Sequence, residues 1–77
     1  MPEYNKLITL INQISDYYKI EESPTVDLDG SNITVTVCCP DMAKTENIAK
    51  HLAILGFRNT YVSRETNIFV FSKLVTN

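Results

Sequence analysis

Two adjacent cysteines and a single histidine are the residues of this 77-residue sequence most suited to covalent or metal chemistry. Cys38 and Cys39 directly precede Pro40. Neighbouring cysteines on a strand point to opposite faces, and no second Cys or His pair completes a tetrahedral zinc site. We therefore expect one inward and one outward ordinary thiol, with no metal, no cofactor and no catalytic residue. In the enzymatic alternative, a cysteine and His51 lie on separate elements but come together in space as nucleophile and base.

A short acidic run, Asp27 and Asp29 before Gly30, has the beginning of a calcium-loop pattern. An EF-hand loop needs further carboxylates, a terminal glutamate and two flanking helices. This run lies between strand-like stretches, and we interpret it as turn chemistry. The sequence also contains no glycine-rich phosphate loop and no nucleophile elbow, so no small-molecule substrate is indicated.

The most informative segment is the run Ile68-Phe69-Val70-Phe71-Ser72, in which two phenylalanines alternate with aliphatic residues. Side chains alternate between the two faces of a strand, so both phenylalanines fall on one face. An uncovered aromatic face usually marks a contact surface. We predict a partner-binding surface made of Tyr61, Val62, Phe69, Phe71, Thr34 and Thr36.

The elements that must position these residues follow from hydrophobic periodicity. Apolar residues from Tyr4 to Tyr18 recur at helical spacing, and a second helical stripe, which Asp41 or Thr45 can cap, ends at Gly56. Between and after these helices, alternating runs predict two hairpins, over residues 25–38 and 60–72. Gly30 suits a turn position that needs a positive φ.

These elements predict one α+β domain over residues 1–77, in the order helix-hairpin-helix-hairpin. A two-layer arrangement, with a four-stranded antiparallel sheet and both helices on one face, buries all the apolar stripes. The order resembles the fold of the pterin-carbinolamine dehydratases, which associate through their sheets. The chain lacks their paired-histidine signature, so the resemblance implies no activity here.

The two hairpins also align with each other at an offset of about 35 residues, as in an internal repeat. This alignment places Ile33 on Ile68 and Val35 on Val70. With or without a true repeat, we expect Ile33, Val35, Val37, Ile68 and Val70 to face the helices. The same period of two sends Phe69 and Phe71 to the uncovered face. In the alternative interpretation the two faces are swapped and both phenylalanines belong to the core.

Three apolar residues lie off the main helical stripes: Leu10 and Tyr17 on the first helix and Ile54 on the second. They fall on the same rotational side of their helices. We expect them to pack against each other where the helices run antiparallel. A groove for a partner is the alternative interpretation.

Composition limits the class of function. The net charge of −2 and the pI near 5.2 are unlike the concentrated positive face of most nucleic-acid binders. The N-terminal sequence has neither a signal-peptide pattern nor a long apolar run, so we expect a cytoplasmic protein without a membrane span. Frequent Asn, Ile, Lys and Tyr are typical of AT-rich coding sequences such as those of many phages.

Two hypotheses follow. The first is a non-catalytic protein-binding module that acts as a regulator or inhibitor, encoded by a phage or mobile element. Its partner is another protein or a second copy, because a domain this small gains stability from association as a homodimer. The second hypothesis is a single-stranded nucleic-acid binder that stacks bases on the same aromatic face, with Arg58, Arg64 and Lys73 binding phosphates.

Overall fold

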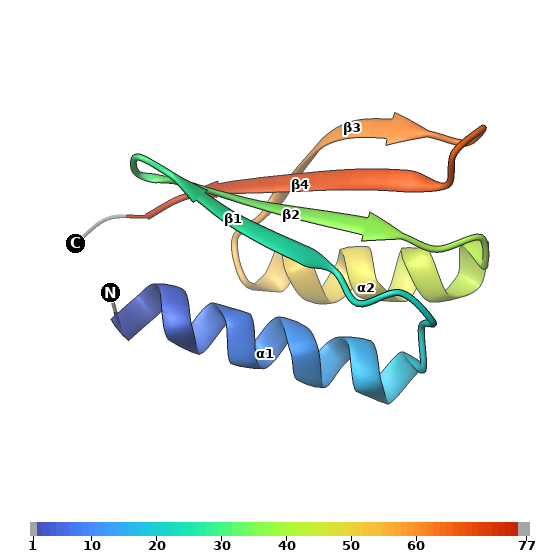
Figure 1. Cartoon of the computed structure of the whole chain (residues 1–77), viewed down its shortest axis with the longest axis horizontal. Helices are drawn as coiled ribbons and strands as arrows, with labels where there is room; N and C mark the ends of the chain where they lie inside the picture. Colours follow the sequence, from blue (N-terminus) through green and yellow to red (C-terminus); the bar gives the residue numbers. More distant parts are fainter. Residues whose placement is uncertain (1, 76–77) are drawn as a thin grey trace.

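The computed structural model describes residues 2–75 and consists of two helices and a four-stranded antiparallel sheet, so the predicted α+β class is confirmed (Figure 1). The elements in chain order are α1 (Pro2–Tyr18), β1 (Thr25–Asp29), β2 (Asn32–Cys38), α2 (Met42–Ile54), β3 (Arg58–Ser63) and β4 (Ile68–Leu74). Within residues 2–75, neither helix is long and apolar enough to cross a membrane.

Helix α1 lies against the sheet through its apolar stripe. Leu7 and Ile11 are buried, one helical turn apart, and Ile14 and Tyr18 continue the stripe at its edge. The Tyr4 hydroxyl donates a hydrogen bond to the carbonyl oxygen of Val26, at 3.3 Å. This bond fixes the start of α1 to β1.

The boundaries of α2 follow from its capping residues. Asp41 is the N-cap, and its carboxylate accepts a hydrogen bond from the backbone N–H of Lys44, at 3.2 Å. At the other end Gly56 has a φ of 97°, and the N–H of Phe57 donates to the carbonyl of Leu52, at 2.9 Å. The predicted glycine stop is therefore confirmed.

The sheet has the strand order β1-β2-β4-β3, and every neighbouring pair is antiparallel. The two hairpins thus lie side by side, joined by the central pair β2 and β4. Gly30 has a φ of 62° in the first turn, as predicted. In Figure 1 both helices lie below the sheet, and no helix or strand of residues 2–75 lies above it.

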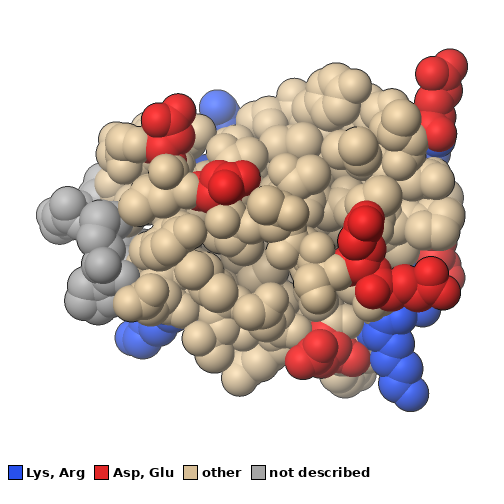
Figure 2. All heavy atoms as spheres, in the orientation of Figure 1, with Lys and Arg blue, Asp and Glu red and all other residues tan. Residues whose placement is uncertain are grey.

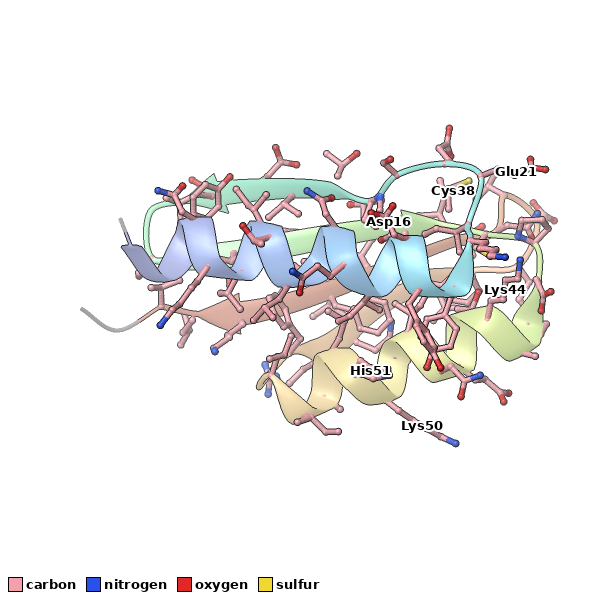
Figure 3. The ribbon with its side chains drawn as sticks, turned by 90° about the horizontal axis from the view of Figure 1, so that it is seen from below. Asp16, Glu21, Cys38, Lys44, Lys50 and His51 are labelled. Carbon is pink, nitrogen blue, oxygen red and sulfur yellow. The ribbon has the colours of Figure 1, made fainter. Side chains whose placement is uncertain are left out.

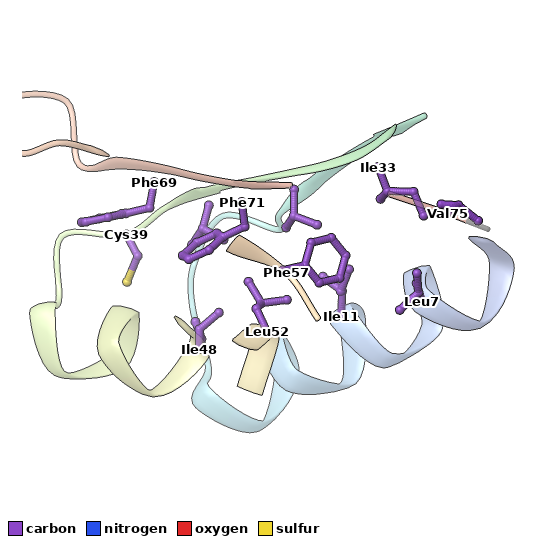
Figure 4. Close-up of a cluster of buried hydrophobic side chains, with 12 residues drawn as sticks. Leu7, Ile11, Ile33, Cys39, Ile48, Leu52, Phe57, Phe69, Phe71 and Val75 are labelled. Carbon is purple, nitrogen blue, oxygen red and sulfur yellow. The ribbon is translucent and has the colours of Figure 1, made fainter. Parts of the chain in front are cut away.

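The core is formed between the helices and the lower face of the sheet (Figure 4). Ile33, Val35 and Val37 of β2 have no exposed surface, as predicted for inward-facing residues. The buried helix residues Ile48 and Leu52 pack in the same cluster. One face of β2 is therefore fully covered.

The predicted faces of β4 are wrong. Phe69 and Phe71 are only 6% and 4% exposed and lie in the core, because Val35 pairs with Phe71 and Val37 pairs with Phe69. Paired residues share a face of the sheet. Each buried phenylalanine removes about 150–250 Å² from water, more than the smaller aliphatic residues beside it. The strand is therefore more stable with the face that carries the two phenylalanines turned toward the core.

Candidate functional site

The upper face of the sheet carries no covering layer, and we call it the open face. Its side chains form rows that cross the strands. The second row runs Asp27, Thr34, Ser72 and Arg58 from β1 to β3, and the third runs Thr25, Thr36, Val70 and Tyr61. The first row is Asp29, Asn32 and Leu74, and the fourth is Cys38, Ile68 and Ser63.

The centre of the open face is apolar. Ile68 and Val70 are half-buried two residues apart on β4, and Val70 pairs with Tyr61 of β3. Tyr61 is 56% exposed and Leu74, at the end of β4, is 70% exposed. The solvated face of an antiparallel sheet ordinarily alternates polar side chains at such positions. Tyr61, Ile68 and Val70 therefore form an apolar strip where polar residues are expected, and Leu74 adds an exposed apolar side chain beyond Ser72.

The edges of the open face are charged, with opposite signs. Asp27 and Asp29 lie on β1, and Arg58 lies on β3, all three exposed. Arg58 pairs with Ser72, which places it on this side of the sheet. The space-filling view shows acidic side chains spread over the surface, with basic ones near the rim (Figure 2). No continuous basic field is visible on this view.

The structure divides the predicted binding residues between two sides. Tyr61, Thr34 and Thr36 lie together on the open face. Val62 pairs with Phe69, so it faces the helical side, at the rim of the core, where it is 43% exposed. Phe69 and Phe71 belong to the core, as described above.

Sequence reasoning missed Ile68, Val70 and Leu74 as members of the surface. One signal was available in the sequence. Both alternating sets of side chains on β4 are apolar, and only one of the two sets can face the helices, so the other set had to be left uncovered. The choice between the two phases depends on the register with β2, which the sequence does not display. A β-bulge between Asn59 and Tyr61 further shifts β3 against β4.

The two cysteines point to different sides, as predicted. Cys39 is 4% exposed and belongs to the core cluster, whereas Cys38 is half-buried at the end of the open face. A hydrogen bond from the thiol to Glu22 raises the pKa of Cys38 above its ordinary value, and burial and the charge of that carboxylate add to the effect. The raised pKa disfavours the thiolate, which is the nucleophilic form.

His51 lies between the two helices, away from Cys38 at the end of the sheet (Figure 3). Its Nε2 atom is 2.9 Å from the hydroxyl of Tyr18, and the two rings meet edge to face. The sole histidine is thus engaged with a tyrosine and is not placed beside a nucleophile. Within residues 2–75, no three His, Cys, Asp or Glu side chains gather into a metal-binding group.

The helical layer presents a second, smaller surface. A hollow between the helices is lined by Leu10, Gln13, Ile14, Tyr17, Tyr18 and His51. Tyr17 is 77% exposed and Ile54 is 83% exposed, so the expected mutual packing of the off-stripe residues is wrong for these two. Leu10 is 38% exposed at the edge of the hollow.

Replacing Glu22 with glutamine is expected to accelerate the alkylation of Cys38 by iodoacetamide at pH 8. Removal of the carboxylate charge lowers the raised pKa of Cys38, so more thiolate is present at the same pH. Mass spectrometry of the intact protein over time measures the rate, and Glu21→Gln is the matched control. Equal rates in the two variants would show that Glu22 does not control this thiol.

Comparisons with known protein families, with curated proteins and with solved structures find no match for this chain. What is shown is therefore an α+β domain with an uncovered, partly apolar sheet face.

Proposed function

We propose that this chain is a small non-catalytic domain that binds another protein chain through the open face of its sheet. The observation that supports the proposal is the apolar strip Tyr61, Ile68 and Val70, with Leu74 beyond Ser72, at positions that face away from the core. Exposed apolar residues that adjoin one another, with a polar rim, are typical of protein interfaces.

The composition of the strip fits this role. A tyrosine beside aliphatic residues supplies apolar area with a polar tip, and tyrosine is enriched among residues that dominate binding energy. Thr34 and Thr36 next to Val70 give a surface with little side-chain entropy to lose, because β-branched side chains are already restricted. The rim carries Asp27 and Arg58, which can set orientation.

A domain of this kind acts by occupying a surface of its partner, as a regulator or an inhibitor does. The AT-rich character of the residue usage suggests a phage or mobile-element protein, and we place its action in the cytoplasm. No step of this role requires bond chemistry, which agrees with a Cys38 thiol held in its protonated form.

The burial of Phe69 and Phe71 disfavours the nucleic-acid hypothesis. Stacking of successive bases needs several exposed aromatic side chains, and Tyr61 is the aromatic residue that the described strands place on the open face. Asp27 and Asp29 on the same face would repel phosphates. Of the three cations in that hypothesis, Lys73 instead donates to the carbonyl of Leu55, at 2.8 Å.

Photocrosslinking tests the proposal. A benzophenone amino acid in place of Tyr61 is expected to give one discrete crosslinked species, either in the purified protein or in a lysate of the source cells. The reason is that this side chain lies in the apolar strip. The same amino acid at Tyr17, which is more exposed but lies on the helical layer, is the matched control and is expected to give none.

A second variant tests whether the crosslink depends on the apolar strip. Val70→Arg should abolish crosslinking from position 61 while circular dichroism shows an unchanged fold, since Val70 pairs with Tyr61 outside the core. Crosslinking from position 17 alone would place the binding surface on the helices and overturn the proposal.

A further inference from the structure

The charges of the open face are arranged so that the face is complementary to itself. In the second row, Asp27 stands at the β1 end and Arg58 at the β3 end, with Thr34 and Ser72 between them. Asp29 stands two residues from Asp27 on the same strand, on the same side. The row therefore runs from negative to positive across the sheet.

These charged side chains have no partner in the part of the chain that the structure describes. Among residues 2–75, the side chains of Asp27, Asp29 and Arg58 make no hydrogen bond or ion pair. Three strand spacings of about 4.8 Å separate the ends of the row, or roughly 14 Å, which is too far for a direct contact. Only another molecule can bring the two ends together.

From this arrangement we infer that the open face binds a second copy of this chain, about a two-fold axis parallel to the strands. The inference rests on the proposed function and names the partner. Such an axis turns one sheet over onto the other, so that β1 lies opposite the partner's β3 and β2 lies opposite the partner's β4. Positions along the strands are kept, so Asp27 meets the partner's Arg58, and Arg58 meets the partner's Asp27.

The row of Val70 is buried under this axis. Val70 lies opposite the partner's Thr36, and Tyr61 lies opposite the partner's Thr25, so the two apolar side chains face threonines, whose methyl groups can pack against them. Aligned sheets cross at about 30°, which shifts the edge strands by about one residue against each other. Asp29 beside Asp27 keeps a carboxylate within reach of Arg58 despite that shift.

The other in-plane axis, perpendicular to the strands, is disfavoured by the same charges. It would place β1 on the partner's β1 and β3 on the partner's β3, with positions along the strands reversed. The acidic residues of both copies would then lie along one edge and both Arg58 side chains along the other, so like charges gather at each edge and neither ion pair forms. The charge pattern thus selects one of two packings that the apolar strip alone would allow.

The size of the face suits a modest dimer. Four strands about 4.8 Å apart, with rows along about 20 Å of strand, cover roughly 400 Å² in projection, and the surface that follows the side chains is larger. Two copies would bury on the order of 1,000 Å², which is near the lower limit for a specific interface. We expect dissociation constants between about 1 μM and 1 mM, so the dilution series must span that range.

A charge exchange tests the inference by sedimentation equilibrium. The wild-type protein should reach twice the 8.7 kDa mass of one chain at high concentration. Asp27→Arg and Arg58→Asp should each weaken the dimer at least about tenfold, since each replaces two attractive pairs with two repulsive ones. An equal mixture of the two variants should regain the wild-type affinity, because both pairs are restored in the mixed dimer.

Matched variants on the helical layer control for net charge. Asp16→Arg and Lys50→Asp make equivalent charge changes on exposed residues of α1 and α2 and should leave the dimer unchanged. Circular dichroism confirms that every variant is folded. The two-fold axis parallel to the strands is supported if the mixture of the two variants regains the wild-type dimer affinity and the control variants leave that affinity unchanged.

Three results would overturn the inference. Failure of the equal mixture to regain the wild-type affinity would contradict the pairing of Asp27 with the partner's Arg58. A dimer that is sensitive to Val70→Arg but not to either charge variant would indicate another packing of the open face, and the proposed function would stand. A wild-type monomer that still crosslinks from position 61 to a different protein would also leave the proposed function in place, with a different partner.

Discussion

Replacing Phe71 with alanine is expected to lower the free energy of unfolding by about 3–5 kcal/mol, the largest effect of any single truncation proposed for this chain. Phe71 is 4% exposed and pairs with Val35, which has no exposed surface. Its ring fills the space between the sheet and Leu52 of α2 (Figure 4). Truncation leaves a cavity that the surrounding side chains fill only in part.

The matched control is the next residue on the strand, on the opposite face. Val70→Ala should cost less than about 1 kcal/mol, because Val70 lies on the open face and its truncation leaves no closed cavity. Urea unfolding followed by circular dichroism measures both variants. A domain of this size has about 4–12 kcal/mol of stability in total, so Phe71→Ala removes a large share of it. A larger loss for Val70→Ala would mean that the faces of β4 are reversed.

The element types were predictable because each has local signals that agree. The stripe from Tyr4 to Tyr18 forms α1, Asp41 caps α2 and Gly56 ends it, all as the sequence indicates. Each of these signals acts over a few residues and needs no tertiary partner. The four-stranded antiparallel sheet follows from two hairpins that must share a core.

The face of β4 was not predictable from the same kind of signal. In Ile68-Phe69-Val70-Phe71 both phases are apolar, so period two does not select one. The prediction grouped Ile68 and Val70 with Ile33 and Val35, as the alignment of the two hairpins does, and that alignment is one residue out of register. Asn32 begins β2 and Ile68 begins β4, so the equivalent of Ile33 is Phe69. A slip of one residue exchanges the faces of the whole strand.

The slip has a local cause in the second turn. The first hairpin turns through Gly30 and Ser31, whereas residues 64–67 separate β3 from β4 and end in Asn67 at a φ of 58°. The bulge between Asn59 and Tyr61 adds a further residue to β3. Turn length and bulges depend on how the strands pair in space, and a repeat alignment does not include them.

The same slip explains why half of the predicted surface was retained. Tyr61 lies on β3 and Thr34 and Thr36 lie on β2, and their faces do not depend on the phase of β4. The prediction of an apolar, uncovered sheet face therefore survives with different central residues. Ile68 and Val70 take the place of the two phenylalanines, with less aromatic area and a shape that suits close packing of two sheets.

Replacing Gly56 with alanine is expected to lower the free energy of unfolding by about 2 kcal/mol. Gly56 has a φ of 97°, where a side chain strains the backbone by about 1–2 kcal/mol. A Cβ atom there would lie 3.3 Å from Cε of Lys73. Lys73 donates to the carbonyl of Leu55 at 2.8 Å, so any displacement also weakens a charged contact with the end of α2.

Gly30 provides the comparison that separates the two contributions. Its φ is 62°, within the left-handed helical region, and a Cβ atom there would meet nothing within 4 Å. Gly30→Ala should therefore cost about 1 kcal/mol, from the backbone alone, and Gly30→Asn still less. Thermal unfolding should show a fall of about 8–16 °C for Gly56→Ala and about half of that for Gly30→Ala. Equal losses at the two positions would show that contact with Lys73 adds nothing, because the backbone strain is then the whole effect.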